Sequence, residues 1–97
     1  MYKVLVVEDD VKLQELIKDK LERYNYHVSI VKDYTDIKGE FLRVEPHLVL
    51  LDINLPYYDG FYWCREIRSI SKVPIIFISA RLSDMDQVMV IEHGGDD

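Results

Sequence analysis

The stretch from Leu48 to Gly60 reads LVLLDINLPYYDG: a short apolar run ends abruptly in a carboxylate, and a turn follows at once. No polar residue alternates with the apolar ones, which is typical of a parallel strand buried on both faces. Asp52 therefore stands where a buried strand leaves the core. Ligands of open parallel sheets bind beyond the carboxyl ends of the strands, where the strand order reverses. Taken alone, however, Asp52 also fits a helix N-cap or a turn.

Two further apolar runs end in the same way. Lys3–Val7 is followed by Glu8-Asp9-Asp10, and Val73–Ile78 is followed by Ser79-Ala80. If these strands are parallel neighbours, their polar ends meet at one edge of the sheet. Carboxylates held that close repel one another, and a bound divalent cation relieves the repulsion. Oxygen ligands without a nearby histidine or cysteine favour a hard ion such as Mg²⁺ over zinc.

Strand-like and helix-like patterns alternate along the whole chain. The predicted strands are about 2–7, 27–31, 48–51 and 73–78, and the predicted helices are about 11–24, 34–44, 61–70 and 84–93. Asp10 and Asp33 are the predicted N-caps of the first two helices, and Ser83 and Asp86 form a capping pair for the last. The alternation predicts an α/β fold, a doubly wound parallel sheet with the strand order 2-1-3-4. The order then reverses between the first and third strands, at the acidic residues.

Four elements of the sequence together carry a family resemblance. They are Glu8-Asp9, Asp52 followed by Leu55-Pro56, Asp59-Gly60, and Ser79-Ala80. Over residues 3–97 they resemble the receiver domain of bacterial two-component response regulators, and the resemblance implies a flavodoxin-like receiver fold. The run FYWCR at residues 61–65 is similar to a subgroup of these regulators. Its members are transcription factors of the winged-helix class related to regulators of peptide-antibiotic resistance.

The resemblance implies a phosphorelay role centred on Asp52. In such a domain Asp52 accepts a phosphoryl group from a sensor histidine kinase, and the domain changes conformation to control an effector, usually transcription. Asp9 and Asp52 are the implied direct ligands of Mg²⁺. Glu8 acts through a water, and the backbone carbonyl of Asn54 completes the protein ligands. The domain is then a phosphoacceptor rather than an enzyme, and it assists only its own phosphorylation and dephosphorylation.

The residues that end the fourth strand have implied roles of their own. Ser79 donates its hydroxyl to a phosphoryl oxygen and shifts when Asp52 is modified. Ala80 leaves room for the phosphate. Arg81, together with Asn54, tunes the lifetime of the acyl phosphate. The plainer alternative for Ser79 is a strand-end serine that bonds only to backbone.

The resemblance also implies parts that this sequence lacks. Residues 1–97 are interpreted as a receiver domain that is incomplete at its carboxyl end, because the fifth strand, its lysine and the fifth helix are absent. A DNA-binding effector domain is expected beyond residue 97. We therefore expect an unpaired edge on the strand at 73–78 and an exposed part of the first helix. Both features favour self-association as a dimer.

Composition limits the other functions. The 97 residues carry a formal net charge of −6, which repels phosphate backbones. DNA is thus expected as a partner only through the missing effector domain. The single cysteine, Cys64, excludes an internal disulfide and fits a reducing compartment. No apolar run approaches the roughly 20 residues that span a bilayer, and no signal-peptide pattern is present. We expect a cytoplasmic protein without membrane contact.

Three other functions compete with this one. A degenerate receiver that is never phosphorylated would act as a protein–protein interaction module. A phosphatase of the haloacid dehalogenase type also places an Asp nucleophile at a strand end. Those enzymes usually have a second Asp two residues later, where this chain has Asn54. A nucleotide-binding fold has no support, because neither G-x-G-x-x-G nor G-x-x-x-x-G-K-[ST] occurs.

Overall fold

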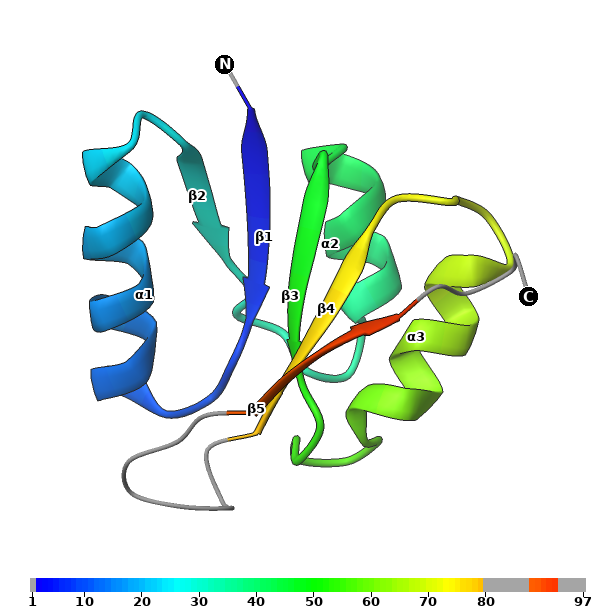
Figure 1. The fold of residues 1–97 in the computed structure, drawn as a ribbon. Helices are drawn as coiled ribbons and strands as arrows, with labels where there is room; N and C mark the ends of the chain where they lie inside the picture. The colour runs from blue at the N-terminus through cyan, green and yellow to red at the C-terminus, as the bar shows by residue number, and fades with distance from the viewer. Residues whose placement is uncertain (1, 80–87, 93–97) are drawn as a thin grey trace.

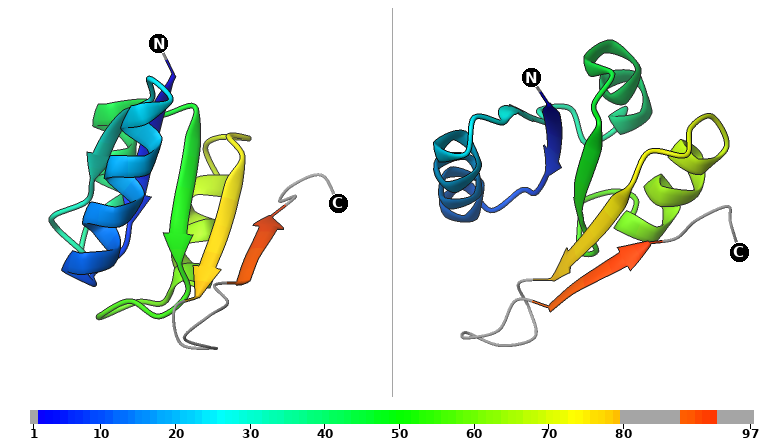
Figure 2. Two further views of the ribbon diagram at one scale, coloured as in Figure 1. Left: turned by 60° about the vertical axis from the view of Figure 1, so that its left-hand side comes forward. Right: turned by 45° about the horizontal axis from the view of Figure 1, so that its top comes forward.

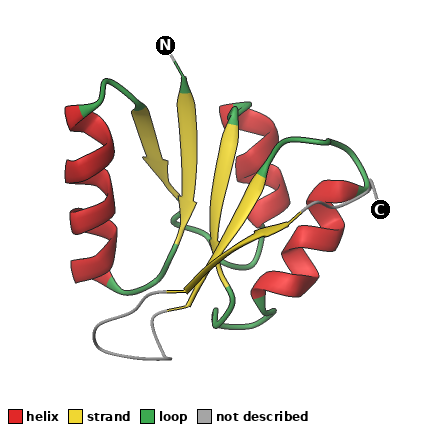
Figure 3. Cartoon of the chain, in the orientation of Figure 1, coloured by secondary structure: helices red, strands yellow, loops and turns green. Residues whose placement is uncertain are grey.

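The computed structural model describes residues 2–79 and 88–92, in which strands and helices alternate (Figure 1). The elements are β1 Lys3–Val7, α1 Val11–Arg23, β2 His27–Ile30, α2 Ile37–Val44, β3 Leu48–Asp52, α3 Gly60–Arg68, β4 Ile75–Ser79 and β5 Val88–Glu92. Figure 3 separates the helices from the strands and from the loops that join them. The elements from β1 to β4 match the predicted ones to within a few residues at each end.

The strands form one sheet in the order β2-β1-β3-β4-β5. β2, β1, β3 and β4 are parallel to one another, so the predicted doubly wound sheet with the order 2-1-3-4 is confirmed. A helix follows each of β1, β2 and β3, because parallel strands need a crossover between them. β1, β3 and β4 therefore end at the same edge of the sheet, and the left view of Figure 2 shows the arrowheads of β3 and β4 pointing the same way. The strand order reverses there, between β1 and β3.

Helices cover both faces of the sheet: α1 lies on one face, and α2 and α3 lie on the other (Figure 2). The side chains of β1 alternate between the faces. Leu5 and Val7 belong to the core beneath α2 and α3, whereas Val4 and Val6 belong to the core beneath α1. Fully burying one such side chain stabilises the fold by roughly 1.5–3 kcal/mol. Within the described residues, no helix combines the length and the apolar character needed to cross a bilayer.

The apolar side chains of α1 form one stripe, which is only partly covered; its members are Leu13, Leu16, Ile17 and Leu21. Leu13 is buried, and Ile17 and Leu21 pack against the sheet. Leu16, on the same stripe, is 54 % exposed. The sequence prediction that part of this stripe is exposed is therefore confirmed.

β5 departs from the sequence prediction. The pattern predicts a helix over 84–93, but Val88–Glu92 forms a strand that runs antiparallel to β4. The helix prediction is wrong for these residues; residues 84–87 and 93 lie outside the described part of the chain. Val88, Val90 and Ile91 are β-branched and favour extended backbone. The edge of β4 offers unpaired backbone groups that such a segment can satisfy.

This strand also changes two related expectations. Four strands were expected from this chain, and the sheet has five. The fifth strand that the resemblance implies would follow residue 97, so β5 is a different segment. The predicted unpaired edge of β4 is wrong, because β5 pairs with it along all of Ile75–Ser79.

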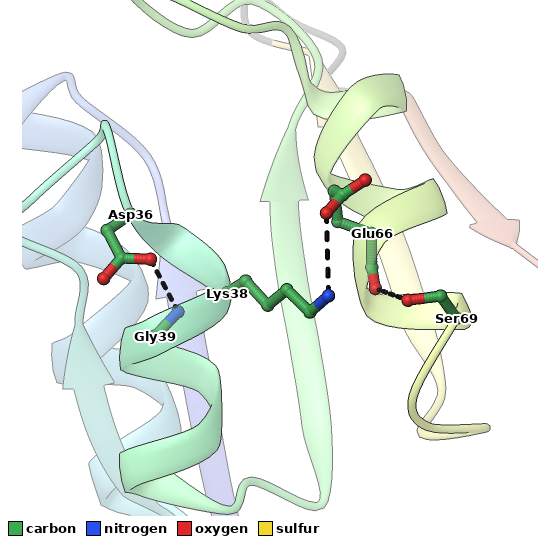
Figure 4. A network of polar contacts seen from close by, with 5 residues as sticks. All are labelled: Asp36, Lys38, Gly39, Glu66 and Ser69. Carbon is green, nitrogen blue, oxygen red and sulfur yellow. Dashed lines mark hydrogen bonds and ion pairs between the residues drawn. The ribbon is translucent and has the colours of Figure 1, made fainter.

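The start of α2 lies later than predicted. Asp33 is not its N-cap; its side chain accepts the backbone N–H of Thr35 at 2.9 Å in a local turn. The cap is Asp36, whose Oδ1 accepts the backbone N–H of Gly39 at 3.0 Å (Figure 4). A Cβ on Gly39 would overlap the Asp36 carboxylate, so glycine lets the cap close. The local turn at Asp33 competes with capping, which is why the first acidic residue of the segment does not start the helix.

An ion pair joins the exposed sides of α2 and α3. Lys38 Nζ lies 3.7 Å from Glu66 Oε1, and the Ser69 hydroxyl donates to the backbone carbonyl of Glu66 at 2.6 Å (Figure 4). The two charged side chains are 33 % and 38 % exposed, so water screens the pair. Such pairs contribute about 0–1 kcal/mol. The two helices are held mainly by Ile37 and Ile67, which are fully buried in their common core.

We expect Asp36→Ala to lower the free energy of unfolding by about 1 kcal/mol, because an N-cap is lost. Asp36→Asn keeps an oxygen acceptor and should stay close to wild type. Lys38→Ala, which removes only the exposed ion pair, should change stability by less than about 0.5 kcal/mol. Urea unfolding of the three variants measures this. Equal losses for Asp36→Ala and Asp36→Asn would contradict the assigned cap.

Candidate functional site

Three acidic side chains meet where β1 and β3 end. Val7 is the register partner of Leu51, so the next residues along the two strands, Glu8 and Asp52, are neighbours. One carboxylate oxygen from each of Glu8, Asp9 and Asp52 lies within 4.8 Å of the other two. Glu8 is 1 % exposed and Asp52 is 4 % exposed, whereas Asp9 is open to solvent. The convergence that the strand ends predict is therefore present.

Backbone N–H groups hold the two buried carboxylates in place. Glu8 Oε2 accepts the N–H of Asp10 at 3.0 Å, and Asp52 Oδ1 accepts the N–H of Asn54 at 3.1 Å. The other oxygen of Glu8, Oε1, is buried and has no hydrogen-bond partner among the described residues. An unsatisfied buried carboxylate oxygen is costly. It fits a position where a water or a cation belongs.

Burial changes the acidity of both carboxyl groups. Burial is the main cause that raises the pKa of Glu8 to about 7; the charges of Asp52, Asp9 and Asp10 contribute to this rise, and the hydrogen bond from the Asp10 backbone opposes it. Burial also raises the pKa of Asp52 and the Asp9 charge adds to this effect, while hydrogen bonds from the Asn54 backbone and with the Glu8 side chain oppose it. Without a cation, the cluster therefore keeps a proton in much of the population near neutral pH.

We expect the stability of the metal-free chain to fall as pH rises because of Glu8. Its pKa rises from 4.5 to about 7 on folding, so the folded chain binds this proton more tightly. The contribution is full below pH 4.5 and is lost as pH rises through about 7. In EDTA, the melting temperature should drop between about pH 5 and about pH 8, and Glu8→Gln should flatten that drop. Asp19→Asn, at an exposed position, should keep the wild-type slope; a wild-type slope in Glu8→Gln would refute the assignment.

Gly60 lets the loop after β3 return to the site. Its N–H donates to the carbonyl of Ile53 at 2.9 Å, and Asp59 caps α3 by accepting the N–H of Tyr62 at 2.9 Å. A Cβ on Gly60 would overlap the backbone carbonyl oxygen of Asp52 and lie 3.0 Å from the Ile53 Cα. Asp59 and Gly60 therefore shape the end of this loop. The first turn of α3 thereby packs directly against the backbone that carries Asp52.

We expect Gly60→Ala to destabilise the chain by about 1–3 kcal/mol, because the overlapped atoms are backbone and cannot move aside easily. Gly39→Ala is the comparison, since its new methyl group meets only the end of the Asp36 side chain. That side chain can rotate away, and the loss of its cap, about 1 kcal/mol, is offset by the helix preference of alanine, up to about 1 kcal/mol. Chemical denaturation should rank Gly60→Ala as the more damaging change. The opposite ranking would show that the backbone at Asp52 and Ile53 can move to make room for the new methyl group.

The remaining predicted site residues are placed only in part. Ser79 is the last residue of β4, one position beyond Ile78, which is the register partner of Asp52. Its backbone pairs with Val88 of β5. The predicted roles of Ala80 and Arg81 fall outside the described residues. The backbone of Asn54 holds Asp52 through its N–H, and the metal-binding role of its carbonyl stays a prediction.

Two side chains that the sequence did not single out also contact the site. The Tyr34 hydroxyl donates to the backbone carbonyl of Glu8 at 2.9 Å, and the Gln14 amide donates to the same oxygen at 2.6 Å. Burial, and then the nearby Asp9 charge, raise the pKa of Tyr34, so its hydroxyl remains a donor at neutral pH. Both line an open groove of about 680 Å³ beside Asp9. Tyr34 is 26 residues away from Glu8 in the sequence, so no local sequence pattern predicts this contact.

Aromatic rings lie beside the same loop. Tyr58 stacks on Tyr62 with ring centroids 4.3 Å apart, and both meet Trp63 edge-on at 5.8 and 4.9 Å. Trp63 and the neighbouring Cys64 are buried in the core beneath α2 and α3. Tyr57 and Tyr58 remain exposed.

Residues 4–97 match the family described as the response regulator receiver domain. The chain belongs to this family. It is 58 % identical, over 97 residues, to a Bacillus subtilis protein described as the uncharacterized transcriptional regulatory protein YvcP. That match covers 100 % of the chain but 41 % of YvcP, so the chain spans less than half of this relative.

Solved receiver domains share the fold. The N-terminal domain of the nisin resistance regulator NsrR, a lantibiotic response regulator, superposes with a TM-score of 0.77 at 45 % identity, covering 89 % of this chain and 73 % of that one. The Thermotoga maritima response regulator TrrA, solved in complex with Mg²⁺-BeF, gives 0.77 at 29 % identity, covering 84 % and 72 %. The predicted relation to peptide-antibiotic-resistance regulators is confirmed by these similarities. A receiver domain is a signalling module, not a classical enzyme.

Proposed function

We propose that this chain is a phosphoacceptor switch: Asp52 takes a phosphoryl group from a phosphohistidine of a sensor histidine kinase, with Mg²⁺ bound beside it. The main support is the cluster of Glu8, Asp9 and Asp52, whose oxygens lie within 4.8 Å of one another at the carboxyl ends of β1 and β3. Membership of the receiver family supports the same function.

The acidic cluster fits Mg²⁺ by its chemistry. All its donors are oxygens, which such an ion prefers. Buried Glu8 Oε1 has no partner in the described part of the chain, and burial raises the pKa of both Glu8 and Asp52. Asp9 and Asp52 would hold the ion directly, Glu8 through a water, and Asn54 through its carbonyl. When bound, the ion supplies positive charge between the Asp52 carboxylate and the incoming phosphoryl group.

The residues of the chain prepare Asp52 for this transfer. The Asn54 N–H holds Asp52 Oδ1 at 3.1 Å and so fixes the carboxylate orientation. A carboxylate oxygen of Asp52 donates an electron pair to phosphorus and forms the new O–P bond. The N–P bond breaks, and the imidazole nitrogen of the donor keeps the electron pair of that broken bond. Ser79 donates its hydroxyl to a phosphoryl oxygen and shifts inward, Ala80 leaves room for the group, and Arg81 with Asn54 tunes its lifetime.

The proposed signalling context extends beyond this chain. The phosphorylated domain controls an effector domain that follows residue 97 and binds DNA, in the cytoplasm. Self-association of the domain remains part of the proposal. It cannot rest on a free edge of β4, because β5 covers that edge. It rests instead on two exposed apolar side chains, Leu16 of α1 and Tyr24, which directly follows that helix.

Labelling with acetyl phosphate, a small phosphodonor, tests the acceptor. We expect Mg²⁺-dependent, acid-stable and base-labile labelling of the wild-type chain, and complete loss in Asp52→Asn, because the amide is no nucleophile. Asp59→Asn is the matched control: asparagine still caps α3, so labelling should persist. Labelling that survives in Asp52→Asn would place the acceptor elsewhere.

Calorimetric Mg²⁺ titration tests the metal-binding part of the proposal. Asp9→Asn should weaken binding by more than about tenfold, since a direct carboxylate ligand is lost. Asp10→Asn keeps the N-cap of α1 and should bind within about threefold of wild type. A wild-type chain that binds Mg²⁺ but is never labelled would instead be the degenerate interaction module.

A further inference from the structure

The backbone carbonyl of Glu8 lies at the point where the sheet stops supplying hydrogen bonds. Along β1, the carbonyls of Tyr2 and Val6 accept N–H groups from His27 and Val31, on the β2 side. Carbonyls of alternate residues point to the same neighbouring strand. The carbonyl of Glu8 is therefore the next one in this row.

The strand donor that the row requires is occupied elsewhere. Continuing the register, the N–H of Asp33 would face Glu8, but it donates to Glu40 Oε2 at 2.8 Å. The N–H of Lys32 donates to the same oxygen at 3.1 Å. Beyond Val31 the chain thus turns away from β1, and the ladder leaves the Glu8 carbonyl without a backbone partner from this segment.

Two side chains take the place of the missing strand donor. The Tyr34 hydroxyl comes from the loop after β2 and lies 2.9 Å from the Glu8 carbonyl oxygen. The Gln14 amide comes from α1 and lies 2.6 Å from the same oxygen. The Gln14 amide nitrogen is also 3.3 Å from the Tyr34 hydroxyl, so the three groups form a closed triangle.

This triangle acts on the acidic cluster through one peptide group. The Glu8 carbonyl belongs to the rigid, planar peptide that joins Glu8 to Asp9. That plane contains the Cα atoms of both residues, so holding it restrains the backbone positions from which both carboxylate side chains start. One of them is buried and one is exposed, and their oxygens must stay within the 4.8 Å span shared with Asp52.

We propose that Tyr34 and Gln14 are positioning residues: together they hold the peptide between Glu8 and Asp9 and thereby set the geometry with which the acidic cluster meets its cation. This inference rests on the proposed function, because it concerns the cation that the acidic cluster is proposed to bind. Neither side chain would be a ligand of the cation. Each acts by keeping two carboxylates in place, so the loss of either should weaken cation binding without removing a ligand.

Calorimetric Mg²⁺ titration of Tyr34→Phe and Gln14→Leu tests the inference. Each variant removes one donor to the Glu8 carbonyl and retains most of the side-chain volume. We expect each to weaken Mg²⁺ affinity by about tenfold, as seen when outer partners of metal ligands are removed. The double variant should lose more affinity than either single variant, because the Glu8 carbonyl then keeps neither of its two side-chain donors. Thr35→Val is the matched control. It removes a hydroxyl from the same loop, but that hydroxyl donates to the Asp33 carboxylate and not to the Glu8 carbonyl.

Thermal unfolding with and without Mg²⁺ separates positioning from a merely structural role. A ligand raises the melting temperature according to its affinity for the folded chain. A purely structural loss lowers the melting temperature equally in EDTA and in Mg²⁺. A positioning loss also shrinks the rise that Mg²⁺ produces, and Thr35→Val should leave that rise unchanged.

The outcomes distinguish this inference from the function on which it rests. If wild type binds Mg²⁺ and is labelled by acetyl phosphate, while both single variants and the double variant keep its affinity within about twofold, the positioning role is overturned. If wild type itself neither binds Mg²⁺ nor is labelled, the proposed function fails first. A tenfold weaker affinity with a reduced Mg²⁺-dependent rise in both single variants supports the inference.

Discussion

Parallel pairing of β1 with β3 forces two acidic side chains to lie side by side at the end of a buried sheet. The register that matches Val7 with Leu51 leaves Glu8 and Asp52 no alternative positions. Both are almost completely buried, in a part of the sheet where apolar residues cover both faces. The surrounding structure compensates with short local contacts: backbone N–H groups at Asp10 and Asn54, and a glycine that lets α3 approach. A change in strand register would abolish all of these at once.

The sequence predicts this site well because the prediction depends on strand direction alone. Three apolar runs each end in polar residues, and parallel strands bring such ends to one edge whatever the details of the loops. Glu8, Asp9 and Asp52 are found together for that reason. Helix starts are harder to predict. Asp33 and Asp36 are both good caps by residue type, and the choice depends on a turn at Thr35 that the residue type does not reveal.

The local sequence pattern could not predict contacts between residues that are distant in the sequence. The apolar residues of the segment at 84–93 are spaced as in an amphipathic helix, although Val88, Val90 and Ile91 are β-branched residues that also favour a strand. Part of it nevertheless forms β5, because the edge of β4 offers a row of backbone partners that the local sequence does not encode. The contact of Tyr34 with Glu8 is missed for the same reason. For β5 the local sequence was compatible with a helix or a strand, and pairing with β4 selected the strand.

The charge of the acidic site affects the free energy of unfolding, because its carboxyl groups have different pKa values in the folded and unfolded chain. Glu8 follows β1 and Asp52 ends β3, and these are two of the three interior strands of the sheet. Their carboxyl groups have raised pKa values because burial disfavours the charged form. The folded state is therefore less stable, near neutral pH, than its core alone would make it. Anything that neutralises charge at this edge stabilises the folded chain as a whole, because the strands that carry the carboxylates also carry the core. In this chain the charge of the acidic site and the free energy of unfolding are therefore coupled, because acidic residues are buried at the ends of two central strands.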